Sequence, residues 1–245
     1  GNLGRIARLM SGAGDFDLGL ILDPDADRLA LLDRDGTFIG EEYTLVLAAA
    51  QRLKTGGPTG PLVANLSTSA MIDSVARANG REVIRTPVGE FHVVQGIRQN
   101  QGIIGGEGNG GVIDPRVGWV RDSLMGAALI LEALAQQPSG TSLSELAQPW
   151  PKLLMIKDKI DLPAGGASVA KQALQAVAEE LKSTMPAAIL DQRDGLHARI
   201  DDQSWIHLRA SNTEPIVRIL LEATSQKDAE QLNLFAKTLI EKSLG

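Results

Sequence analysis

The strongest constraint on the fold is the alternation of short apolar runs with longer amphipathic segments through the first 140 residues. The runs expected to form buried strands are 18–22, 28–33, 62–66, 82–85 and 102–105. The segments expected to form helices are 41–54, 69–79, 90–100 and 121–136. Strands and helices that alternate along a chain are typical of βαβ units, in which helices cover a mostly parallel sheet. The sequence therefore predicts an α/β fold with mixed sheets and flanking helices for this part.

A different pattern begins between Pro149 and Pro151. We expect a strand over 152–161, a helix over 167–183, a hairpin that turns near Asp201 and Asp202, a strand over 215–222 and a closing helix. Strands that pack on two helices indicate a small C-terminal α+β domain. We therefore expect a domain boundary near residues 138–150.

Composition excludes several classes of protein. With 43% hydrophobic residues the chain can form a packed core, and its net charge of −6 argues against broad binding to nucleic acid or anionic membranes. The absence of cysteine excludes disulfides, cysteine-ligated metals and thiol catalysis. No apolar run approaches the roughly 18 residues of a membrane span, and the first residues resemble no targeting peptide. We therefore expect a cytoplasmic protein, and the missing initiator Met suggests a piece of a longer chain.

The most informative local feature is Asp23-Pro24-Asp25-Ala26-Asp27-Arg28, which joins two apolar strands. Three crowded carboxylates repel one another unless a cation lies among them, and Mg²⁺ prefers such oxygen ligands. Arg28 adds a guanidinium suited to a phosphate oxygen. Two alternatives remain open. The loop could be an ordinary solvated turn, or it could be the nucleophile loop of a haloacid-dehalogenase-type phosphatase, which it resembles in part. In that case Asp23 would accept the phosphoryl group, although Asp27 stands where those enzymes usually have Thr or Val.

A glycine-rich stretch spans residues 105–111. Gly106, Gly108 and Gly111 match the dinucleotide-binding spacing, but a β-branched pair and a proline follow where that motif should open a helix. We expect instead a tight loop that presents Glu107 and Asn109 to the hydroxyl groups of a ligand. A merely flexible loop is the alternative.

A third polar stretch reads Arg209-Ala210-Ser211-Asn212-Thr213-Glu214-Pro215 and is followed by Arg218. Its arginine, hydroxyls, amide and backbone N–H groups could together bind a phosphate dianion. An ordinary polar hairpin loop is the alternative, and Arg218 could equally form a structural salt bridge.

These motifs, in this order and together with Thr86-Pro87-Val88-Gly89, resemble those of the α-D-phosphohexomutase superfamily, which includes phosphoglucomutase, phosphomannomutase and phosphoglucosamine mutase. The family's sugar loop often reads Gly-Glu-x-Ser-Gly-His, whereas Asn109 and Gly111 replace the Ser and His here. Nothing in the sequence matches the loop that carries the family's phosphoserine. The resemblance therefore implies the end of domain 2 over residues 1–40, all of domain 3 over residues 41–140 and all of domain 4 over residues 150–245 of a four-domain enzyme.

The resemblance implies transfer of a phosphoryl group between the 1- and 6-positions of a hexose phosphate through a phosphoserine and a bisphosphate intermediate. Mg²⁺ is the implied cofactor, and the missing N-terminal domains are the implied partner. The chain alone should be inactive, and a non-catalytic sugar-phosphate-binding module is the remaining alternative. The implied roles are metal binding by Asp23, Asp25 and Asp27, assistance at the transferring phosphoryl group by Arg28, sugar binding by Glu107 and Asn109, and phosphate binding by Arg209, Ser211, Asn212, Thr213 and Arg218.

Overall fold

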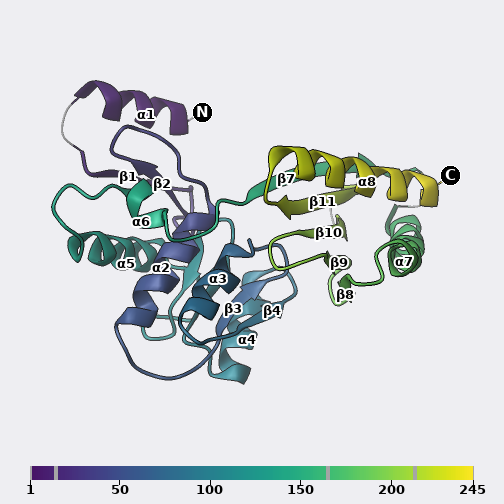
Figure 1. The fold of residues 1–245 in the computed structure, drawn as a ribbon, viewed down its shortest axis with the longest axis horizontal. Helices are drawn as coiled ribbons and strands as arrows, with labels where there is room; N and C mark the ends of the chain where they lie inside the picture. Colours follow the sequence, from purple (N-terminus) through teal and green to yellow (C-terminus); the bar gives the residue numbers. More distant parts are fainter. Residues whose placement is uncertain (1, 14–15, 164–165, 212–213, 245) are drawn as a thin grey trace. The chain divides into compact units, whose positions relative to one another are not determined.

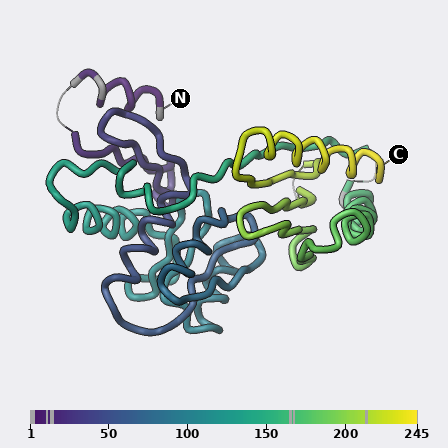
Figure 2. The backbone as a smooth tube through the Cα atoms, viewed as in Figure 1, coloured from purple at the N-terminus to yellow at the C-terminus, as the bar shows by residue number. Residues whose placement is uncertain are grey.

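The computed structural model describes residues 2–13, 16–163, 166–211 and 214–244. The chain forms two compact units, Gly1–Pro151 and Lys152–Gly245 (Figure 1), and each is described by itself. The course of the backbone through each unit can be followed in Figure 2.

The first unit begins with helix α1 (Asn2–Ala13) and a two-stranded antiparallel sheet. Strand β1 (Leu18–Leu22) pairs with β2 (Leu29–Asp33), so that Leu22 lies opposite Leu29 at the end where the acidic loop joins them. Apolar residues on both sides of a polar turn favour such a hairpin. The hairpin therefore holds residues 23–28 between two fixed points.

The rest of the first unit is built on a four-stranded sheet in the order β4 (Val83–Thr86), β3 (Leu62–Asn65), β5 (Ile104–Glu107) and β6 (Gly111–Ile113). β3 runs parallel to β4 and β5, whereas β6 returns antiparallel to β5. All four residues of β3 are buried, as expected for a central strand with helices around it. The carboxyl ends of the parallel strands place Asn65, Thr86 and Glu107 along one edge of the sheet.

Five helices accompany these strands. They are α2 (Glu42–Lys54), α3 (Met71–Ala78), α4 (Glu90–Asn100), α5 (Ser123–Ala135) and α6 (Leu143–Ala147). α4 packs Val93 and Ile97 against Val63 and Ile113 of the sheet. α2 and α5 lie against each other, and both contact the sheet. Among the described residues, no helix is both long enough and apolar enough to cross a membrane.

The second unit is a five-stranded antiparallel sheet packed on two helices. The strand order is β7 (Leu154–Asp161), β11 (Ile216–Ala223), β10 (Trp205–Ala210), β9 (Leu196–Arg199) and β8 (Ile189–Asp191). Alternate residues such as Leu208 and Ile219 form the core with α7 (Gly166–Thr184) and α8 (Gln226–Leu244). The other residues of these strands, including Arg209 and Arg218, therefore lie on the opposite face of the sheet.

The predicted fold class is confirmed, because mixed sheets with flanking helices are followed by an α+β unit. Four elements were not predicted, namely α1, β6, α6 and β8. Two of them, β6 and β8, have only three residues, which is too short for an alternation of apolar and polar positions to be recognised. β6 follows the glycine-rich stretch directly, so this stretch opens a strand and not the helix that a dinucleotide-binding motif requires.

Candidate functional site

The acidic loop brings together the three carboxylates that the sequence singles out. One oxygen from each of Asp23, Asp25 and Asp27 lies within 4.8 Å of the others. Ala26 adopts a φ of 58°, which is rare for a residue with a side chain, and its carbonyl accepts a hydrogen bond from Ser123 Oγ at 2.6 Å. The start of α5 therefore holds the loop in a conformation that turns its alternate aspartates toward a common point.

Hydrogen bonds and burial give these aspartates different acidities. Burial alone would raise the pKa of Asp23, but hydrogen bonds from the Arg28 backbone N–H and guanidinium outweigh it and lower the pKa to about 2. Burial raises the pKa of Asp27, and repulsion from Asp25 and Asp23 adds to this effect against the attraction of Arg121. The raised pKa of Asp27 thus reflects first its burial and then the crowding of like charges, and a bound cation would offset both.

The donor set fits a hard divalent cation such as Mg²⁺. Asp27 Oδ1 is buried and forms no hydrogen bond within the part of the chain that the structure describes, although Arg28 Nε lies 3.6 Å away. A buried carboxylate oxygen without a donor is costly unless an ion or water satisfies it. Asp23, Asp25 and Asp27 are thus the residues that could hold the ion.

Arg28 folds back onto the acidic loop. Its Nε lies 2.5 Å from Asp23 Oδ2, and its side chain remains 44% exposed. Both oxygens of Asp23 therefore accept hydrogen bonds, since Oδ1 also accepts from the backbone N–H groups of Asp27 and Arg28.

The glycine-rich stretch forms the turn between β5 and β6, beside the end of the acidic loop. The carbonyl of Gly110 accepts a hydrogen bond from Leu29 N at 3.1 Å, and Leu29 is the first residue of β2. Gly110 has a φ of 91°, and a Cβ there would lie 2.3 Å from Leu29 O. The close approach of the two backbones therefore requires glycine at this position.

Glu107 is buried at the end of β5 and holds several segments together. Its Oε1 accepts from Asn65 Nδ2 at 2.7 Å and from Gly89 N at 3.0 Å, while its Oε2 accepts from Arg121 Nη1 at 2.6 Å. Asn109 is half-buried in the following turn, where its Oδ1 accepts from Gly111 N. Contact of Glu107 and Asn109 with sugar hydroxyls stays a prediction.

Arg121 was not among the residues selected from the sequence, yet it joins the acidic loop to Glu107. Its Nη2 forms an ion pair with Asp27 Oδ2, and its Nε donates to Glu90 Oε2 at 3.1 Å. Glu90 begins α4, directly after the Thr86-Pro87-Val88-Gly89 turn. The available signal was a charged pair, Arg121 and Asp122, before a helix, and that pattern is equally typical of an ordinary helix cap.

Of the predicted phosphate-binding residues that the structure describes, Arg209 lies in β10, Ser211 follows that strand and Arg218 lies in β11. Arg209 and Arg218 are directly opposite each other in the register, and Lys159 of β7 follows Arg218 in the same row. Arg209 forms an ion pair with Asp194 at 2.9 Å, and Ser211 N donates to Ile216 O. Asn212 and Thr213 lie outside the described residues. Lys159 was not predicted, and it extends the cationic row to three side chains.

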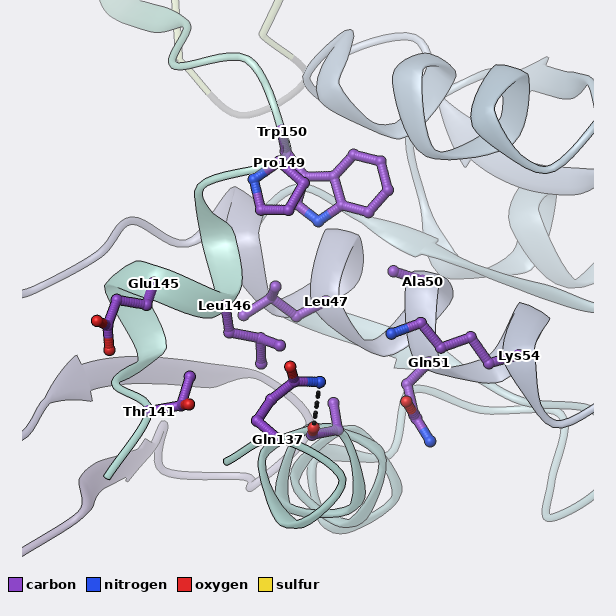
Figure 3. A pocket seen from close by; sticks show the side chains of 11 residues that line it. Leu47, Ala50, Gln51, Lys54, Gln137, Thr141, Glu145, Leu146, Pro149 and Trp150 are labelled. Carbon is purple, nitrogen blue, oxygen red and sulfur yellow. Dashed lines mark hydrogen bonds between the residues drawn. The ribbon is translucent and has the colours of Figure 1, made fainter. Parts of the chain in front are cut away.

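The pocket in Figure 3 is a separate feature of the first unit. It has a volume of about 150 Å³ and lies among α2, α5, α6 and Trp150. Gln137 Nε2 donates to the carbonyl of Ala133 there, as the dashed line in Figure 3 shows. None of the acidic-loop or glycine-rich residues lines this pocket.

Comparison with known proteins assigns the chain to a family. Residues 40–153 match the family model described as phosphoglucomutase/phosphomannomutase, alpha/beta/alpha domain III, and residues 166–236 match that of the C-terminal domain. The chain belongs to the phosphoglucomutase/phosphomannomutase family, within the α-D-phosphohexomutase superfamily.

Relatives of known sequence agree with this assignment. A phosphoglucomutase/phosphomannomutase of Thermococcus kodakarensis is 38% identical over 228 residues, which are 93% of this chain and 48% of that protein. A probable phosphoglucosamine mutase of Methanopyrus kandleri is 34% identical over 90% of this chain and 47% of its own length. The chain thus spans about half the length of the curated relatives that it matches.

Solved structures show the same fold. A phosphoglucomutase/phosphomannomutase family protein of Burkholderia thailandensis superposes with a TM-score of 0.79 at 21% identity, over 99% of this chain and 50% of that one. An Aspergillus fumigatus N-acetylphosphoglucosamine mutase, solved in complex with GlcNAc-6P and magnesium, gives a TM-score of 0.66 at 17% identity over 99% of this chain and 53% of its own. At such identities the likeness concerns the fold alone.

Proposed function

We propose that the chain is the C-terminal part of a phosphohexomutase that moves a phosphoryl group between the 1- and 6-positions of a hexose phosphate. Family membership supports this assignment, and one structural observation carries it, namely the convergence of Asp23, Asp25 and Asp27 within 4.8 Å beside the Glu107 turn. In this proposal a phosphoserine in the preceding part of the enzyme donates the group and a bisphosphate sugar is the intermediate. The hexose could be glucose, mannose or glucosamine.

The chain's own residues would bind and orient the reacting groups. Asp23, Asp25 and Asp27 would hold Mg²⁺, which supplies positive charge at the phosphoryl oxygens when bound. The exposed guanidinium of Arg28 would donate to the transferring phosphoryl group. Glu107 and Asn109 would accept hydrogen bonds from sugar hydroxyls.

The second unit would bind the phosphate that does not react. Arg209 and Arg218 lie side by side across two strands, and like charges in that position are unfavourable unless an anion lies near them. Ser211, Asn212 and Thr213 follow Arg209 closely in the sequence and would add hydroxyl and amide donors. Arg218 Nη2 also lies 3.5 Å from Glu214 Oε2, so this ion pair would have to break when phosphate binds.

Two measurements test the proposal. Titration calorimetry should detect glucose 1-phosphate or mannose 1-phosphate binding to the chain, and Arg209→Gln should weaken it at least tenfold because a charge-assisted contact is lost. The matched control is Arg199→Gln, which removes a positive charge from β9 of the same sheet and should change the affinity less than twofold. Equal losses in both variants would contradict the assigned phosphate site.

A coupled mutase assay tests the division of labour. The 245-residue chain should show no conversion of either sugar phosphate, whereas the enzyme with its preceding domains should convert it and lose activity in Asp25→Asn. Robust conversion by the chain alone would refute the proposal that the phosphoserine lies in the preceding part of the enzyme. Release of inorganic phosphate that disappears in Asp23→Asn would support the phosphatase alternative instead. Tight sugar-phosphate binding without turnover by the longer enzyme would indicate a binding module.

A further inference from the structure

Arg121 lies where carboxylates from three separate segments meet. Its guanidinium contacts Asp27 of the acidic loop, Glu90 at the start of α4 and Glu107 at the end of β5. The side chain is 21% exposed, so these contacts are shielded in part from water and salt. Among the described residues, Arg121 is the only cation within ion-pair distance of Glu107.

The backbone on which Arg121 stands is fixed. Its own N–H donates to Glu90 Oε2 at 3.1 Å, and the next residue, Asp122, caps α5 by accepting from Met125 N at 2.9 Å. Asp122 N also donates to Val112 O of β6 at 2.8 Å. The guanidinium is therefore presented from a rigid base, and its position depends little on its own flexible stem.

We propose that Arg121 is a positioning residue that couples cation binding at the acidic cluster to the charge state and position of Glu107. Arg121 holds Asp27 by Oδ2 and leaves the buried Oδ1 for the cation, while the same guanidinium holds Glu107 Oε2. The planar guanidinium offers donors in a fixed fork, so separate nitrogens hold the two carboxylates in one geometry. This inference rests on the proposed function, because it takes the cluster to be a Mg²⁺ site.

The coupling has a definite sign. Arg121 contacts Asp27 through Nη2 while Glu107 holds the same guanidinium through Nη1. If Glu107 is replaced by a neutral side chain, that second hold is weakened, and Arg121 can move closer to Asp27 and compete with a divalent cation for its carboxylate. Neutralising Glu107 should therefore weaken Mg²⁺ binding through Arg121, although Glu107 is not one of the three clustered aspartates.

A double-mutant cycle on Mg²⁺ affinity tests this coupling. Calorimetric titration of the chain with Mg²⁺ at about 0.15 M salt, where long-range effects are screened, would compare the unaltered chain with Glu107→Gln, Arg121→Gln and the double variant. Glu107→Gln should raise the Kd about fivefold in the unaltered background and less than twofold in Arg121→Gln. The same fold-change in both backgrounds would mean additive effects and would overturn the coupling.

Two further variants separate positioning from mere charge or mere stability. Arg121→Lys keeps the charge but has a single nitrogen in place of the fork that contacts Glu107 through Nη1 and Asp27 through Nη2, so it should also reduce the coupling below twofold. This variant serves in place of Arg121→Gln if that variant fails to fold. Full coupling in Arg121→Lys would show that charge alone suffices and would overturn the assignment.

Arg77→Gln, on the exposed side of α3, is the control for loss of one positive charge. If the unaltered chain binds no Mg²⁺, the metal site fails and this inference with it, whereas Mg²⁺ binding with additive variants sinks this inference alone.

Discussion

His207 should make the stability of the second unit depend on pH between about 6.5 and 4. The side chain is fully buried in β10, and burial lowers its pKa from 6.5 to about 4, although the hydrogen bond between Nε2 and the Asp194 carbonyl opposes the shift. Because a carbonyl only accepts, Nε2 carries the proton of the neutral ring. The folded unit therefore holds His207 neutral over a range in which the unfolded chain would protonate it.

The size of the effect follows from the two pKa values. Between pH 6.5 and pH 4 the unfolded state binds more protons than the folded state, so the free energy of unfolding falls as the pH falls. With pKa values of 6.5 unfolded and about 4 folded, the loss relative to neutral pH is about 2 kcal/mol at pH 5 and about 3 kcal/mol at pH 4. A loss of this size is a large share of the stability of a domain of this kind.

The assay must report the second unit by itself. Hydrogen–deuterium exchange of peptides from β8 to β11, measured across a urea series at several pH values, gives the free energy of unfolding of that sheet. His207→Gln keeps a donor for the Asp194 carbonyl but takes up no proton, so its stability between pH 7 and pH 4.5 should fall by about 2 kcal/mol less than that of the unaltered chain.

The control is His92→Gln, because His92 is exposed on α4 of the first unit and should leave this pH dependence unchanged. If the His207→Gln variant loses as much stability on acidification as the unaltered chain, buried His207 is not the source and the reasoning is refuted.

Three other substitutions should act on the first unit. Gly110→Ala should lower the free energy of unfolding of the first unit by about 3 kcal/mol in urea denaturation, and Gly140→Ala by about 1 kcal/mol. Both glycines have positive φ, but only the Cβ added at position 110 would clash with the backbone. Gln51→Met should raise the free energy of unfolding by about 1 kcal/mol, because the buried amide beside the Figure 3 pocket has no hydrogen-bond partner among the described residues. A fall in this free energy would indicate that a bound water or ligand pairs with the amide. Asp33→Ala should lower the free energy of unfolding by about 2 kcal/mol, because that carboxylate accepts from two backbone N–H groups at the start of α6, and unchanged stability would contradict this role.

Local patterns were sufficient to predict the two strands around the acidic loop and the helices that flank the parallel strands. The apolar runs around residues 23–28 predicted β1 and β2, whereas their antiparallel pairing in a sheet of their own was not predicted. The helix over 90–100 was predicted at its observed bounds, since its apolar positions recur with helical spacing and Gly89 precedes it. These elements depend on neighbours in the sequence, which is the information that patterns contain.

The role of Arg121 depends on contacts that no local pattern contains. Its partners Asp27, Glu90 and Glu107 come from segments 94, 31 and 14 positions earlier in the chain, and they meet only when the sheet, α4 and the hairpin have packed. The sequence identified Asp27 and Glu107 as candidates for chemistry, but not Glu90. It could not indicate that one guanidinium would hold all three, because that outcome is decided by tertiary packing.

Lys159 shows how strongly such predictions depend on strand register. Alternation along β7 puts Lys157 and Lys159 on one face and Ile156 and Ile160 on the other, which the sequence alone could indicate. The place of Lys159 beside Arg218 also requires the pairing of β7 with β11, and a slip of one residue would put Asp158 there instead. Such a slip would replace a third cation next to Arg209 and Arg218 with an anion, and it would turn Ile160 out of the core. The same burial that fixes the register therefore also fixes the charge of this face, and the phosphate site that we propose depends on both.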